Sequence, residues 1–266
     1  ASTDYMKSYA EQIRAYLPKG RQYKVLGTDG FGRSDFRSKL REHFEINRHY
    51  IVVAALKALS DEGAVPAAKV AEAIQKYGIK AEHLIQVIEG CEMDLNQNRY
   101  LDRAGLEAYA HLVAGVVGEV SALIFGQSQD QTTAYAHQLG LAFQWTNILR
   151  DVGEDALRGR IYLPIEDLQR HGVKAHEILN RIESDRFVQL MTELSLYTQN
   201  LYDQALALLP EVDRRAQKPG LMMCSIYRTL LNEMTLAGFP VLRERVALTP
   251  LRKFWLAWKM QALGRF

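Results

Sequence analysis

QWTNILRDVGED, residues 144–155, places four oxygen-bearing side chains on one face of a predicted helix. Asn147, Asp151 and Asp155 follow one another at intervals of four residues, and Gln144 lies seven residues before Asp151, so a helix carries all four on one side. Two carboxylates and two amides on one face of a largely apolar helix are costly unless something occupies the space beside them. Mg²⁺ commonly bridges carboxylates to phosphate oxygens. The stretch therefore predicts a helix that binds Mg²⁺ and a diphosphate.

Three arginines, Arg150, Arg158 and Arg160, lie around this face or just beyond it. A guanidinium group matches phosphate oxygens in a bidentate manner, so these side chains suit a diphosphate ligand. A solvated charged face with ordinary ion pairs is the alternative interpretation. The regular spacing of amides and carboxylates beside the arginines favours the metal site.

Other polar residues give weaker signals. A second acidic group, Glu89, Glu92 and Asp94, is more simply interpreted as the polar end of a helix. Tyr109 has a direct role only if it faces the same cleft. The seven histidines are scattered, without an HxxxH pair or a convincing triad with Ser or Cys, so nucleophilic catalysis is set aside.

The bulk composition is that of an ordinary globular protein, with 48% apolar and 24% charged residues among 266. A net charge of +2 does not favour nucleic-acid binding. Cys91 and Cys224 are far apart, which favours a reducing, cytoplasmic setting over a disulfide framework. We expect no signal peptide and no uninterrupted apolar run of membrane-spanning length. The basic, amphipathic stretch 248–266 suits either peripheral contact with the inner membrane surface or docking of its tryptophans into the core.

The chain changes character near residue 80. Residues 80–266 predict a bundle of antiparallel helices with no alternating strand pattern. The predicted helices span residues 80–98, 102–125, 130–155, 165–171, 182–209, 219–237 and 251–263. Residues 1–79 mix helical patterns with a short strand candidate and a glycine-rich loop, which predicts a partial α/β segment. The predicted fold is therefore mainly α, with a mixed α/β fragment before it.

Residues 80–266 resemble the squalene/phytoene synthase family, and within it the bacterial presqualene diphosphate synthases. Four motifs carry the resemblance, and the third is the most specific: GCEMDLNQNRYLD, YAHLVAGVVGEVSALIFG, LGLAFQWTNILRDVGEDALRGRIYLP and MMCSIYRTLLNEM. Enzymes of this kind join two farnesyl diphosphates head to head. Mg²⁺ assists the loss of diphosphate from one molecule, and the double bond of the second traps the allylic cation in a cyclopropyl product.

The resemblance also implies roles for individual residues. It implies that Asn147, Asp151 and Asp155 bind Mg²⁺, the two aspartates forming the second aspartate-rich motif of the family. It implies substrate contact for Gln144, Tyr227, Arg150 and Arg160. Arg150 and Arg160 would also be catalytic, by stabilising the diphosphate. Tyr109 matches a tyrosine near the reacting carbons.

Residues 1–79 depart from the family pattern, because they contain nothing like its first aspartate-rich motif. The aspartates there stand singly, with no second aspartate three or four residues on. Instead, ASTDYMKSYAEQIRAYLP, YKVLGTDGFGRSDFRSKLREHFE and YIVVAALKAL resemble the C-terminal segment of the homodimeric decarboxylase component of bacterial pyruvate dehydrogenase. The chain is thus expected to join two unrelated fragments within residues 77–82.

Three hypotheses follow for function. The first is a Mg²⁺-dependent prenyltransferase that forms presqualene diphosphate and is impaired by the missing motif. The second is a non-catalytic binding or assembly protein of the same fold. The third makes the N-terminal segment the functional part, which is disfavoured because that segment lacks a cofactor site and is too short for a whole domain.

Overall fold

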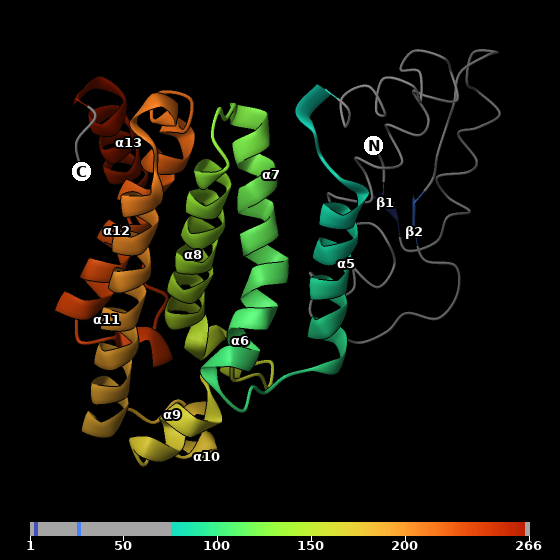
Figure 1. The fold of residues 1–266 in the computed structure, drawn as a ribbon. Helices are drawn as coiled ribbons and strands as arrows, with labels where there is room; N and C mark the ends of the chain where they lie inside the picture. The colour runs from blue at the N-terminus through green and yellow to red at the C-terminus, as the bar shows by residue number, and fades with distance from the viewer. Residues whose placement is uncertain (1–2, 5–25, 28–75, 264–266) are drawn as a thin grey trace. The chain divides into compact units, whose positions relative to one another are not determined.

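The computed structural model describes residues 3–4, 26–27 and 76–263 (Figure 1). The chain divides into two compact units, Ala1–Lys76 and Tyr77–Phe266. In the first unit, the described residues form two short parallel strands, β1 (Thr3–Asp4) and β2 (Leu26–Gly27), with Thr3 opposite Leu26. Of the helices predicted over residues 4–16, 36–44 and 66–77, the structure describes only Asp4, which lies in β1 and not in a helix, and residues 76–77, which are helical. The other residues of these three helices, and the single aspartates Asp29, Asp35 and Asp61, lie outside the described residues.

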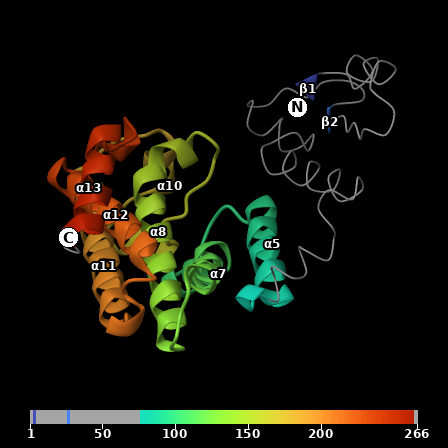
Figure 2. The ribbon, with the colours of Figure 1, turned by 90° about the horizontal axis from the view of Figure 1, so that it is seen from above.

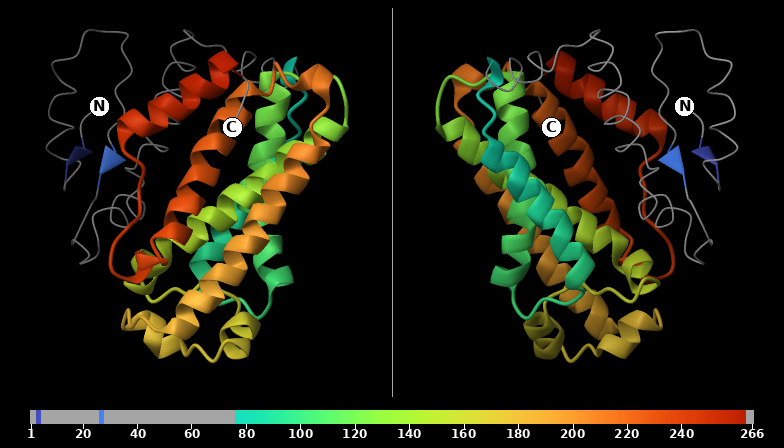
Figure 3. Two further views of the ribbon diagram at one scale, coloured as in Figure 1. Left: turned by 90° about the vertical axis from the view of Figure 1, so that its left-hand side faces the viewer. Right: turned by 90° about the vertical axis from the view of Figure 1, so that its right-hand side faces the viewer.

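The second unit is helical throughout its described part, as the sequence predicts. Its elements are α5 (Ala81–Asn96), α6 (Arg103–Ala110), the π-helical turn η2 (His111–Gly115), α7 (Val116–Phe125), α8 (Gln131–Ala156), α9 (Ile165–Arg170), α10 (Ala175–Leu179), α11 (Asp185–Leu208), the 3-10 turn η3 (Glu211–Asp213), α12 (Lys218–Leu236), the 3-10 turn η4 (Pro240–Leu242) and α13 (Pro250–Leu263). Figure 3 shows this unit from two sides, with the short α9 and α10 at one end of the bundle.

Helix α8 is the central element, with α7 packed on one side and α11 and α12 on the other (Figures 1 and 2). Helix α8 contacts α11 through both an aromatic pair and a hydrogen bond. Trp145 is fully buried and meets the Tyr197 ring edge-on at 5.1 Å, and Thr146 Oγ1 lies 2.7 Å from the hydroxyl of the buried Tyr202. This packing fixes the rotation of α8, and so decides which side chains point toward α11 and which do not.

Two buried aspartates anchor the ends of the bundle. Asp213 accepts hydrogen bonds from Ser128 and Thr132 at the start of α8, and these bonds lower its pKa to about 2. Asp167 of α9 is fully buried and accepts from Arg103 of α6 through two bonds of 2.9 Å. Both carboxylates are fully bonded, which is the condition for burying a charge in a stable fold.

The run Arg103–Phe125, which spans α6, η2 and α7, is long and apolar enough to cross a membrane by length and composition. Glu107, His111 and Glu119 interrupt this run, so it differs from the uninterrupted apolar run that the sequence was expected to lack. The same run lies against α8 and carries Arg103, His111 and Glu119. Core helices of soluble proteins pass the same test, so the finding alone is weak evidence for a membrane span.

Candidate functional site

The candidate site begins on the last three turns of α8. Asn147, Asp151 and Asp155 stand at intervals of four residues on this regular helix, all partly buried. Gln144 lies one turn earlier, also partly buried. The structure therefore gives the predicted residues the common helical face that their spacing requires.

Asp151 is held by two arginines. Arg150 donates to both of its carboxylate oxygens, at 2.8 Å from Nε and 2.5 Å from Nη2, and Arg245 Nε donates to Oδ1 at 3.0 Å. Burial opposes the charge of Arg150, but the bonds to Asp151, and then the Tyr227 hydroxyl, raise its pKa. Arg245 also lies 3.7 Å from Glu154. Asp151 thus occupies the fork of donors that a phosphate group would use.

A pocket of about 290 Å³ adjoins these arginines. Its cationic groups are Arg150, Arg245 and Lys253, and Tyr227 of α12 contributes its ring. The rest of the wall is largely apolar and comes from Met223, Ile226, Leu230, Val246, Ala247 and Leu248. A pocket with cations at one side and apolar walls elsewhere suits an amphiphile that carries an anionic head and a hydrocarbon chain.

A second cluster lies at the end of α8, where Asp94 from α5 meets residues far away in the sequence. Arg160 Nη1 and Tyr162 donate to Asp94 Oδ1 at 3.0 and 2.7 Å, and Tyr109 donates to Oδ2 at 3.1 Å. The interpretation of Asp94 as part of a plain polar helix end was therefore wrong. Asp94 is the acceptor that brings Tyr109 and Arg160 together.

The tyrosines of this cluster form an aromatic group. The rings of Tyr100, Tyr109 and Tyr162 lie with their centroids 5.5 to 5.9 Å apart. Burial is the main reason that the pKa of Tyr109 is raised well above its usual range, and burial with the bond to Asp94 raises that of Tyr162 to about 12. All three therefore stay neutral at physiological pH and offer electron-rich ring faces.

Asp155 links the two clusters electrostatically. Its pKa is raised to about 6, chiefly by burial and then by repulsion from Asp151, with a smaller contribution from Asp94. Arg158 and Arg160 act in the opposite direction. Three carboxylates that repel one another in a partly buried space form a site whose charge a cation would relieve.

The donor set fits Mg²⁺, the metal that the sequence predicts. Asn147 Oδ1 is buried and has no hydrogen-bond partner within the described part of the chain. An amide oxygen of this kind, next to two carboxylates on the same helix face, is a ligand set suited to a hard dication. The residues present therefore fit the metal on grounds of their own chemistry.

Sequence reasoning missed two residues of the site, Asp94 and Arg245. The sequence does hold the acidic group that contains Asp94, but nothing in it shows that Arg160, 66 residues later, reaches that carboxylate. Arg245 lies 94 residues after Asp151, in a stretch without a recognisable motif. Neither residue could be found from the sequence, because tertiary packing, and not local spacing, brings them to the site.

Comparison with known proteins gives two different results along the chain. The family model described as squalene/phytoene synthase matches residues 33–252. Presqualene diphosphate synthase from Sinorhizobium fredii is 33% identical over 181 residues, which are 68% of this chain and 65% of that protein. The chain thus covers slightly less than two thirds of this relative's length.

The N-terminal segment matches a different protein. The pyruvate dehydrogenase E1 component of Pseudomonas aeruginosa is 65% identical over 82 residues, which are 31% of this chain but only 9% of that enzyme. Among solved structures, a dehydrosqualene synthase crystallised with a ligand has a similar fold, with a TM-score of 0.62 and 24% identity over 86% of this chain and 79% of that one.

Proposed function

Because the chain belongs to the squalene/phytoene synthase family, we propose that it binds farnesyl diphosphate with Mg²⁺ and condenses two molecules head to head to presqualene diphosphate. The observation that carries this proposal is the pairing of Asp151 with Arg150 and Arg245 beside a largely apolar pocket. Diphosphate recognition and hydrocarbon binding are the two requirements of such a substrate, and both lie within one region of the molecule.

The chemistry requires one C–O bond to break with its electron pair leaving on diphosphate. Two C–C bonds then form at the double bond of the second molecule, and one proton is lost. When bound, Mg²⁺ supplies positive charge to the leaving diphosphate. Arg150 and Arg245 supply fixed donors at the same position, which stabilise negative charge as it develops. Arg160 is held by Asp94 and Tyr162 at the other end of the aspartate row.

The neutral tyrosines support the cationic part of the reaction. Ring faces attract a cation, and a buried ring surface keeps water from it. Tyr109 is 4% exposed and its hydroxyl is bonded to Asp94, so its ring is fixed in place. We propose that Tyr109 faces the reacting carbons as a neutral group, and that Tyr227 and Gln144 contact the substrate.

The missing first aspartate motif limits this activity. Its loss leaves Asn147, Asp151 and Asp155 as one wall of the metal site, so charge on the leaving group is neutralised from one side only. We therefore expect binding of farnesyl diphosphate with turnover well below that of a two-motif enzyme. A non-catalytic binding protein of the same fold is the second candidate, and the intact row on α8 favours at least ligand binding.

The test incubates the full chain with farnesyl diphosphate and Mg²⁺ and measures both product and thermal stability. We expect slow formation of presqualene diphosphate, about 100-fold slower or more in Asp151→Ala. We also expect Mg²⁺-dependent stabilisation, by about 2.7 kcal/mol when ligand is 100-fold above its Kd. Arg245→Gln should weaken this stabilisation. Arg243→Gln should not, because Arg243 is exposed and pairs with Glu183 instead.

The results separate the two candidates. Stabilisation without product identifies a binding protein, whereas product that survives Asp151→Ala places the chemistry elsewhere. Absence of both product and stabilisation would overturn the proposal.

We also propose peripheral contact with the cytoplasmic membrane surface through α13. Leu251, Phe254, Trp255 and Trp258 recur at helical spacing and are 82, 72, 57 and 48% exposed. Docking of the tryptophans into the core, the alternative that the sequence allowed, does not occur. Lys253 on the same helix lines the pocket of the candidate site, so contact with lipid would bring a membrane-soluble substrate close to it.

A further inference from the structure

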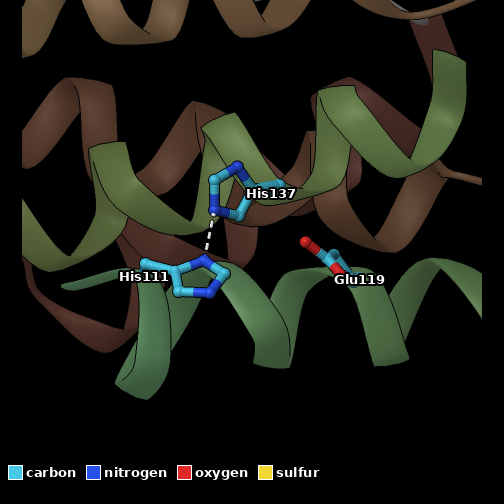
Figure 4. A group of neighbouring side chains, drawn as sticks. All are labelled: His111, Glu119 and His137. Atoms are coloured by element: carbon cyan, nitrogen blue, oxygen red, sulfur yellow. Dashed lines mark hydrogen bonds between the residues drawn. The ribbon is translucent and has the colours of Figure 1, made fainter. Parts of the chain in front are cut away.

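Two histidines and a glutamate meet on the side of α8 that faces α7 (Figure 4). His111 is the first residue of η2, Glu119 lies on α7 and His137 lies on α8. One ligand atom from each lies within 4.8 Å of the others, and His111 Nδ1 is 2.9 Å from His137 Nε2. None of the three belongs to the aspartate and arginine clusters described above. The sequence gives no sign of this meeting, because His111 and His137 lie 26 residues apart.

The π-helical turn brings two of these residues to the same face. In a regular α-helix, Glu119 would stand about 80° around the axis from His111, because eight residues exceed two turns. A π-helical turn adds a residue to the helix, and such turns are frequent at functional sites. Here the turn lies between the two side chains, and both reach the same point opposite His137.

Glycines in the facing backbone leave the space that the His137 ring occupies. A Cβ on Gly115 would lie 2.4 Å from Cδ2 and 2.5 Å from Nε2 of His137, so only glycine leaves room for this ring. Gly118 and Gly140 bring the two backbones into contact on either side, since a Cβ there would lie 2.2 and 2.3 Å from carbonyl oxygens of the facing helix. The three side chains are thus held between elements in backbone contact, as a preformed site requires.

The chemistry of the three groups suits a transition metal. Burial lowers the pKa of His137; Glu119 acts against this and His111 reinforces it. A neutral imidazole is the form that binds a metal. Two nitrogens and one carboxylate oxygen are a typical set for Zn²⁺ with a fourth position open, whereas Mg²⁺ prefers oxygen ligands throughout.

The distance between the two imidazole nitrogens requires only a small adjustment. Two nitrogens on a tetrahedral zinc ion lie about 3.3 Å apart, given Zn–N bonds of about 2.0–2.1 Å. The observed 2.9 Å contact therefore needs to open by a few tenths of an ångström. His83 Nε2 of α5 lies 3.9 Å from Glu119 Oε2, which is beyond hydrogen-bond distance, so it adjoins the three groups without binding the carboxylate.

We propose that His111, Glu119 and His137 bind a Zn²⁺-type dication that joins the η2–α7 segment to α8. This site is independent of the proposed prenyltransferase activity. Its role is to fasten α7 to α8, the helix that carries the aspartate row. Without a metal, the two imidazoles keep their mutual hydrogen bond.

The test titrates the chelator-treated full chain with Zn²⁺ against a chromophoric chelator, with excess Mg²⁺ present to occupy the carboxylate site. We expect one equivalent of Zn²⁺ to bind and the melting temperature to rise. His137→Gln and Glu119→Gln should each weaken binding at least tenfold. His176→Gln, on the exposed face of α10, and Asp155→Asn should bind as the parent does. Less than one equivalent in the parent, or unchanged binding in His137→Gln, would overturn the proposal.

A second measurement needs no variant, and so does not depend on whether a substituted chain folds. X-ray absorption at the zinc edge of the loaded parent chain should show two imidazole ligands with oxygen completing the shell. A shell without imidazole would place the metal elsewhere and reject the site.

Discussion

At the scale of single residues, the negative charge of Asp155 destabilises the folded state of the metal-free protein, because the side chain is buried and repelled by Asp151. Its pKa of about 6 exceeds the ordinary value near 3.8, mainly because of burial and then because of Asp151. Between these two values the folded chain keeps a proton that the unfolded chain has lost. The contribution of Asp155 to the stability of the metal-free protein should therefore fall as pH rises from about 4 to about 6, by about 3 kcal/mol for a shift of about 2 units.

Asp155→Asn should remove that penalty. We expect the metal-free variant to gain about 1–3 kcal/mol in free energy of unfolding at pH 7.5, with a flatter pH profile between 4 and 6. Urea unfolding in chelator, followed by helical circular dichroism, measures this. Glu92→Gln, exposed on α5, serves as the control and should change little. A variant less stable than its parent at pH 7.5 would show that Arg158 and Arg160 already compensate the charge.

Residue types and spacing predicted the row on α8, because its members share one regular helix. They did not predict the hydrogen-bond partners of those side chains. Asp151 accepts hydrogen bonds from Arg150 and Arg245, and Asp94 accepts from Tyr109 and Arg160. The residues in these pairs lie up to 94 positions apart in the sequence. Such pairings follow from how helices pack, which no local pattern contains.

At the scale of elements, the contact between η2–α7 and α8 depends on its glycines. Gly140 lies in the interior of α8, where alanine would ordinarily favour the helix by about 1 kcal/mol. Its Cβ, however, would lie 2.3 Å from the carbonyl oxygen of Ala114 and 3.2 Å from Gly115 Cα. A clash with backbone is not relieved by a change of rotamer, so the helices must separate.

Gly140→Ala should therefore destabilise the helical unit by about 1–3 kcal/mol despite its better helix propensity. Thermal and urea unfolding measure this change. Ala134→Val adds volume at an exposed position of the same helix and should cost well under 1 kcal/mol. If Gly140→Ala proved neutral or stabilising, the close approach of η2 and α8 would not hold in solution.

Helix positions were the part of the fold that sequence predicted well. Glycine and proline mark several ends, and α7 ends at Gly126 with φ +102 while α12 is followed by Gly238 with φ +71. The prediction missed α10, whose five residues are too few for a periodic signal. It also missed the π turn at His111, because a register change arises from packing between helices and leaves the apolar pattern nearly intact.

At the scale of the whole molecule, the exposed apolar face of α13 stands out. Trp255 and Trp258 stack at 5.1 Å beside basic residues, an arrangement typical of contact with anionic lipid. We expect the chain to cosediment with phosphatidylglycerol vesicles, and Trp255→Ala with Trp258→Ala to lower the partition coefficient about tenfold or more. Leu196→Ala, an exposed apolar change on α11, should leave sedimentation unchanged. Equal sedimentation of the tryptophan variant and its parent would reject membrane contact through α13.

Two stretches of the chain are similar to different proteins, and the residues proposed for the chemistry lie in one of them. Its N-terminal segment matches 9% of a pyruvate dehydrogenase component, and the aspartates of residues 1–79 stand singly. The residues that carry the proposed chemistry all lie between Asp94 and Lys253. The proposed activity therefore rests on residues of the helical unit, among them the row that we propose binds the metal.

The ion pairs of Asp151 make the two ligands of the site interdependent. While Arg150 and Arg245 are bonded to this carboxylate, the carboxylate is not free to bind a metal, and the two guanidinium groups are not free to bind an anion. A dication that draws Asp151 away releases both guanidinium groups, and an anion that draws the guanidinium groups away releases the carboxylate. By thermodynamic linkage, each ligand then raises the affinity for the other by the same factor. The site should therefore fill cooperatively, each ligand binding more tightly when the other is present.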